Sequence, residues 1–68
     1  MKSLSAIRLE KGKTQEDMAK DLGISIVAYH LYETGQRKIP GEKVAMIANI
    51  LGIDKIEDIF LPSTFSLR

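Results

Sequence analysis

The sequence contains no cysteine and no tryptophan, and only two of its 68 residues are proline. Without cysteine, and with no cluster of metal-ligating side chains, neither disulfides nor a zinc site can brace the fold, and we expect no metal and no cofactor. A chain this short fits one small domain and has no room for an enclosed active site. Domains of about this size bury only about 60% of their unfolded surface, so dimerisation would help this one.

Long apolar runs are also missing. The N-terminal segment MKSLSAIRLEKGK carries charges throughout, so we read no signal peptide and no membrane span in it and expect a soluble, cytoplasmic protein. Ten Lys and Arg face nine Asp and Glu, a formal net charge of +1. Bulk charge this balanced does not point to nucleic acid, so any electrostatic attraction must come from local clusters.

Apolar residues recur instead at helical spacing, which predicts an all-α fold of five short helices. Residues 1–61 form the domain, and residues 62–68 are a tail that is either a short strand, available for dimerisation, or disordered. The predicted helices cover about residues 3–11, 15–22, 25–34 and 42–51, with a fifth that starts at Asp54 and is ended by Pro62.

The second and third helices are separated only by Gly23 and Ile24. Thr14 is a suitable cap for the second helix, with Asp17 three positions on to reach back, and Ser25 is a suitable cap for the third. A connection this short requires the two helices to meet at a steep angle. This short helix, tight glycine turn and second short helix form the central arrangement of the sequence.

These residues resemble the Cro and phage-repressor family of helix-turn-helix proteins, often called Xre-like. The likeness covers about residues 4–60 and rests on TQEDMAKDLGIS, then Glu33-Thr34-Gly35, Pro40, IANILGI and EDIF. It implies a phage-repressor-like DNA-binding domain whose helix-turn-helix lies in the second and third helices. The matched positions are Gln15, Ala19, Gly23, Ser25, Glu33, Gly35, Pro40, Ala48 and Leu51.

The resemblance further implies a sequence-specific regulator of transcription, a repressor, that reads the major groove of double-stranded DNA with its third helix. It also implies a buried ion pair between Arg8 and Glu33, the alternative being two charged residues that never meet. The positions that read bases in the family are occupied here by Ser25, Ile26, Val27 and Leu31.

That reading helix departs from the usual chemistry, because it offers no Arg, Lys, Gln or Asn before Gln36. Apolar side chains read thymine methyl groups and shape, so we expect A·T-containing half-sites. DNA-backbone contacts are expected from a set of polar and basic residues, although Gln15 and the QRK loop can also be read as ordinary solvated positions. The set is Lys13, Thr14, Gln15, His30, Gln36, Arg37 and Lys38.

An enzyme is not expected. Ser25, His30 and Glu33 are spaced so that their side chains do not converge on one helix.

A second reading is a protein-protein interaction module that uses the apolar outward face of the third helix, with weak or no specific DNA binding. We also expect a homodimer on a near-palindromic operator, unless the fourth helix is buried all round and the tail disordered. The predicted dimer face comprises Met46, Ile50, Phe65 and Leu67.

Overall fold

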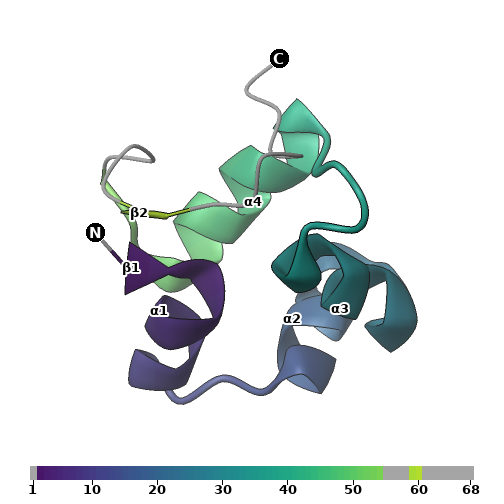
Figure 1. The fold of residues 1–68 in the computed structure, drawn as a ribbon. Coiled ribbons are helices and arrows are strands. Elements are labelled where there is room, and N and C mark those ends of the chain that lie inside the picture. Colours follow the sequence, from purple (N-terminus) through teal and green to yellow (C-terminus); the bar gives the residue numbers. More distant parts are fainter. Residues whose placement is uncertain (1, 55–58, 61–68) are drawn as a thin grey trace.

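The computed structural model describes residues 2–54 and 59–60. In chain order its elements are β1 (Lys2–Ser3), α1 (Leu4–Glu10), α2 (Gln15–Leu22), α3 (Ile26–Thr34), α4 (Gly41–Leu51) and β2 (Ile59–Phe60) (Figure 1). Within these described residues, none of the helices is long and apolar enough to cross a membrane.

Helices α1, α2 and α3 begin where short polar side chains satisfy the first free amide groups, whereas α4 follows Pro40 and has no side-chain cap. Ser3 Oγ accepts a hydrogen bond from the Ala6 amide at 3.1 Å, and Ser25 Oγ accepts one from the Ala28 amide at 3.0 Å. At α2 the bonding is reciprocal: the Asp17 amide donates to the Thr14 hydroxyl, and the Thr14 amide donates to the Asp17 carboxylate. The predicted helix over 15–22 is therefore confirmed together with its cap.

The turn between α2 and α3 depends on one left-handed residue. Gly23 has φ of 70°, a conformation that residues with a Cβ atom adopt rarely. The Ile24 amide bonds back to the Ala19 carbonyl at 3.0 Å and closes the end of α2. From α4, Lys43 Nζ donates to the Leu22 carbonyl at 2.9 Å, so a second helix holds the same turn.

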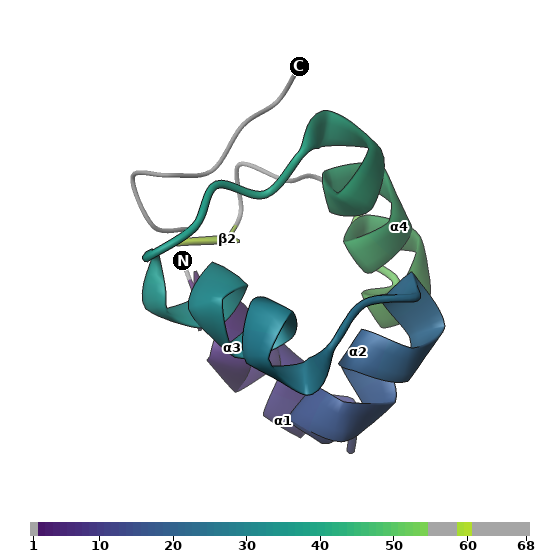
Figure 2. The same cartoon turned by 90° about the vertical axis from the view of Figure 1, so that its right-hand side faces the viewer.

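One apolar core joins the four helices. Ala19 is buried in α2, which packs against both α3 and α4, and its small side chain suits this crowded position. In Figure 2, α3 and the loop after it lie toward the viewer while α1 lies behind. The core residues are Leu4, Met18, Ala19, Leu22, Tyr29, Tyr32, Ile39, Val44, Ile47 and Leu51.

The prediction of five helices is wrong: the described residues contain four. Where the fifth helix was expected to turn Ile59 and Phe60 inward, these two residues form β2, which pairs in parallel with β1. A short apolar run does not distinguish helix from strand by periodicity, and pairing with Lys2 and Ser3 gives this backbone an alternative to helical bonding. Residues 55–58 and the predicted tail at 62–68 lie outside the described residues.

Candidate nucleic-acid interface

Helix α3 has an apolar outer side. Tyr29 is fully buried on its inner side, whereas Ile26 and Val27 are exposed by 48% and 64%. His30 is also exposed, while Leu31 is half-buried at the edge of this side. We call Ile26, Val27 and His30 the outer face of α3. Its two aliphatic side chains present methyl groups to the surroundings, which is chemistry suited to another apolar surface.

Ser25 stands at the start of this helix and is exposed. One lone pair of its hydroxyl already accepts the Ala28 amide, while the hydroxyl proton remains available to an outside acceptor. The four predicted base-reading residues therefore lie within two turns of α3 and its cap, with Leu31 the least accessible of them.

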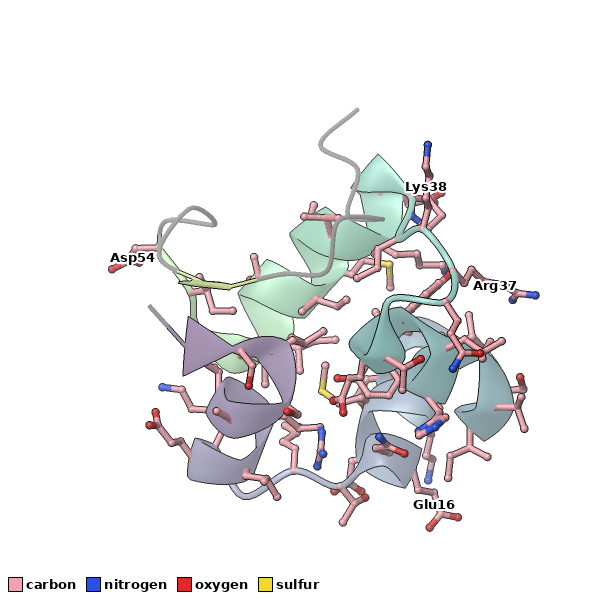
Figure 3. All side chains as sticks on the ribbon, in the orientation of Figure 1. Glu16, Arg37, Lys38 and Asp54 are labelled. Carbon is pink, nitrogen blue, oxygen red and sulfur yellow. The ribbon has the colours of Figure 1, made fainter. Side chains whose placement is uncertain are left out.

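Apart from His30, which lies on the outer face of α3, the predicted backbone-contacting residues lie in two groups, one at the start of α2 and one after α3. Gln36, Arg37 and Lys38 are exposed in the loop between α3 and α4, and Figure 3 shows Arg37 and Lys38 projecting outward from it. At the start of α2, Thr14 is exposed but serves as the cap, and Lys13 Nζ lies 3.3 Å from Asp21 Oδ2 in a surface ion pair.

Gln15, the third residue of the α2 group, is half-buried and points toward α3. Its Nε2 donates to Glu33 Oε1 at 2.9 Å. Glu33 Oε2 accepts hydrogen bonds from Arg8 Nε and from the Tyr29 hydroxyl, each at 2.6 Å. Arg8 also donates from Nη1 to the Lys13 carbonyl at 2.8 Å. We call the side chains of Arg8, Gln15, Tyr29 and Glu33 the Glu33 network.

This network is nearly closed to solvent, since the Arg8 and Glu33 side chains are only 9% and 5% exposed. Burial by itself raises the pKa of the Glu33 carboxyl, but the hydrogen bonds from Arg8, Tyr29 and Gln15, together with the Arg8 charge, outweigh it and hold that pKa below its ordinary value. The hydrogen bond to Glu33 in turn raises the pKa of Arg8. Both groups are therefore ionised at neutral pH.

The same surroundings act on Tyr29 in the opposite sense. Its burial, followed by its hydrogen bond to Glu33 and the negative charge of that carboxylate, raises the pKa of the Tyr29 phenol far above its ordinary value. The phenol is thus a fixed hydrogen-bond donor. The structure therefore brings Arg8 and Glu33 together and surrounds them with two further donors.

Sequence reasoning missed two contacts, the bond from Tyr29 to Glu33 in the Glu33 network and the bond from Lys43 to the turn between α2 and α3. Tyr29 precedes Glu33 by four residues, a spacing that places both on one side of a helix, so the sequence does hold a signal for that contact. The bond from Lys43 to the Leu22 carbonyl has no comparable local signal, because it joins two separate helices. The sequence analysis predicted that Gln15 contacts the DNA backbone and did not predict its hydrogen bond to Glu33.

The predicted dimer face is divided. Met46 and Ile50 are half-buried and pack against the core of their own chain, so part of their apolar surface is already used. Phe65 and Leu67 lie outside the described residues. Among the described residues there is also no group of three or more His, Asp or Glu side chains that could hold a metal ion.

A family model described as helix-turn-helix matches residues 4–57, which is more than half of the chain. This range contains α1 to α4 and both groups of predicted DNA-contacting residues. No curated protein and no solved structure matches the chain.

Proposed function

This chain belongs to the helix-turn-helix family of Cro-type and phage repressors, a family of DNA-binding regulators, and from that premise we propose that it is a sequence-specific repressor of transcription. It reads the major groove of double-stranded DNA with α3. The observation that carries the proposal is the outer face of α3, where Ile26 and Val27 are 48% and 64% exposed on a helix whose other side is buried. A domain that occupies an operator can repress by blocking access to it.

The backbone contacts are proposed to come from two groups of residues, one at the start of α2 and one after α3. The first turn of α2 offers its free amides to a phosphate, with Lys13 and Thr14 beside it. One hydrogen of the Gln15 amide is bonded to Glu33, and the second is proposed to reach the same phosphate. Gln36, Arg37 and Lys38 bind phosphates beyond the end of α3, with His30 closer to the groove. If about four phosphates are neutralised per protomer, the logarithm of affinity falls with that of salt concentration with a slope of about −3 to −4 for each protomer bound, or about −7 for a dimer.

Base reading is proposed to rely on shape and on methyl groups. Ile26, Val27 and Leu31 have no hydrogen-bonding groups in their side chains and so favour thymine, whose methyl group lies in the major groove. Ser25 adds one hydroxyl donor. Deformability of the site supplies further discrimination, which favours A·T-containing half-sites. Two copies of the chain, related by two-fold symmetry, then bind a near-palindromic operator with half-sites about one helical turn apart.

The test is selection of bound sites from a random duplex library by the purified protein, at two salt concentrations. We expect enrichment of a two-fold symmetric, A·T-containing site that survives the higher salt. Binding without enrichment, lost as salt rises, would contradict sequence reading and leave only attraction to phosphates.

A second candidate function is a protein-protein interaction module that docks a partner on the outer face of α3. The exposure of the outer face favours this function. Burying a fully exposed Val or Ile side chain stabilises a protein or a complex by about 1.5 to 3 kcal/mol, so a partner that covered Ile26 and Val27 would gain up to this free energy from each. The variant Val27→Ala/Leu31→Ala separates the two functions. A DNA reader loses preference for its selected site, by about tenfold or more if one base contact is lost, and keeps its salt-dependent binding. A docking module loses its partner with little change on DNA.

A further inference from the structure

The bond between Gln15 and Glu33 is the contact of the Glu33 network that reaches α2 through a side chain. Arg8 Nε and the Tyr29 hydroxyl fix Glu33 relative to α1 and to its own helix, while Gln15 Nε2 joins it to the first residue of α2. An ionised carboxylate only accepts hydrogen bonds, so the Gln15 amide must turn its nitrogen toward Glu33. The orientation of this amide is therefore dictated by its buried partner.

The residues just before Gln15 are held by the same network. Arg8 Nη1 donates to the Lys13 carbonyl at 2.8 Å, so one guanidinium bonds both to Glu33 on α3 and to the segment that leads into α2. The proposed phosphate-binding segment, residues 13–15, is thus tied to α3 at two points that lie far from the Gly23 turn. An eight-residue helix is about 12 Å long, so a small rotation of α3 about the turn is amplified at the opposite end of α2.

We infer that Gln15 determines sequence specificity without touching a base, by fixing the register between the phosphate-binding start of α2 and the reading helix α3. This inference rests on the proposed DNA-binding function. Phosphate contacts set where a protein sits on the duplex, while groove contacts read the sequence. Only if the two are rigidly joined does a phosphate contact place Val27 and Ile26 at defined base pairs. If α2 and α3 could move relative to each other, phosphate and groove contacts would both still form, but α3 could then contact different base pairs.

The variant Gln15→Met tests this inference, because methionine keeps the length of the side chain and removes its hydrogen bonds. The matched control is Tyr29→Phe, which removes a different hydrogen bond to Glu33 and leaves the α2 contact in place. Affinities are measured for the selected duplex and for a scrambled duplex at one salt concentration. Thermal melting by circular dichroism verifies that each variant is folded at the assay temperature.

We expect Gln15→Met to lower the ratio of the two affinities by roughly fivefold to tenfold, about the effect of one weakened base contact, while Tyr29→Phe leaves the ratio within about twofold. Equal losses on both duplexes would reduce Gln15 to a simple phosphate contact and overturn the inference, with the proposed function intact. An equal fall of the ratio in both variants would also overturn it, since any loosening of the network would then suffice. A wild-type protein that does not distinguish the duplexes would overturn the proposed function itself, and the inference with it.

Discussion

Helix α3 buries a charged side chain on its inner side, next to two tyrosines of the core, and exposes aliphatic side chains on its outer side. On the inner side, Glu33 is a buried carboxylate bonded to Arg8, Gln15 and Tyr29, while on the outer side Ile26 and Val27 are aliphatic and exposed. In the described part of the chain no buried side-chain nitrogen or oxygen lacks a hydrogen-bond partner. The buried polar atoms of this helix are therefore all hydrogen-bonded within the protein, while the aliphatic side chains of the outer side remain in contact with solvent. The first side serves the fold, and the second is the surface on which we propose that DNA binds.

The largest effect is expected from breaking the inner side. Glu33→Leu leaves the buried Arg8 guanidinium without its counter-charge, which should lower the free energy of unfolding by about 3 to 5 kcal/mol in denaturant titrations. The same change at exposed Glu16 is the control and should cost little. A small loss from Glu33→Leu would mean that the network contributes no more than a surface ion pair.

The double variant Arg8→Met/Glu33→Leu sharpens this result. Removing both charges together replaces the ion pair with apolar side chains and should recover most of the stability lost in Glu33→Leu, because no uncompensated charge remains buried. A double variant as unstable as the single one would indicate that the hydrogen bonds of the network, rather than its charge balance, dominate.

Protonation of Glu33 by acid should lower the free energy of unfolding by less than Glu33→Leu does, because the protonated side chain stays in place. The pKa of Glu33 is lower in the folded protein than its ordinary value of 4.5, so its contribution is complete above that value and is lost as the pH falls through the folded-state pKa. Asp17 acts in the same direction, because the hydrogen bond from the Thr14 backbone lowers its pKa.

The free energy of unfolding, measured from pH 7 down into this acidic range, should therefore fall below about pH 4.5. In Arg8→Met/Glu33→Leu the fall should be shallower, with the part due to Asp17 remaining. An identical pH dependence in the two proteins would remove Glu33 from the explanation.

The smallest expected effect comes from the loop beyond the outer face. Lys38→Gln removes one exposed positive charge from each protomer, so the slope of log affinity against log salt should become less steep by about 1 for each protomer bound, on specific and scrambled duplexes alike. Stability should not change. An altered preference between the duplexes would assign Lys38 to base reading instead.

Local sequence signals predicted most of the fold. The second helix is found at the predicted residues, and the fourth begins one residue earlier than predicted, because caps and apolar spacing act over neighbouring residues. The fifth helix failed for the opposite reason: Ile59 and Phe60 pair with Lys2 and Ser3, from the other end of the chain. Such a nonlocal partner leaves no trace in the local pattern.

The candidate site divides in the same way. Helical spacing divided α3 into two largely apolar sides, and the family resemblance, which the match confirms, indicated which side faces outward. The resemblance also supplied the pairing of Arg8 with Glu33. The orientation of Gln15 toward Glu33 was not predictable, because it depends on how α2 and α3 cross. The sequence thus indicated the apolar outer face of α3, while the three-dimensional structure was needed to find the contacts of the Glu33 network that position this helix.

The most direct test of the outer face is to replace thymine by uracil, one position at a time, in the selected duplex. This change removes only the methyl group that the aliphatic side chains are proposed to contact and leaves the hydrogen-bonding edges of the base unchanged. The wild-type protein should lose affinity at specific positions, and Val27→Ala should be insensitive to the replacement at the position that Val27 reads. No loss at any thymine, or equal losses in both proteins, would contradict methyl reading by α3.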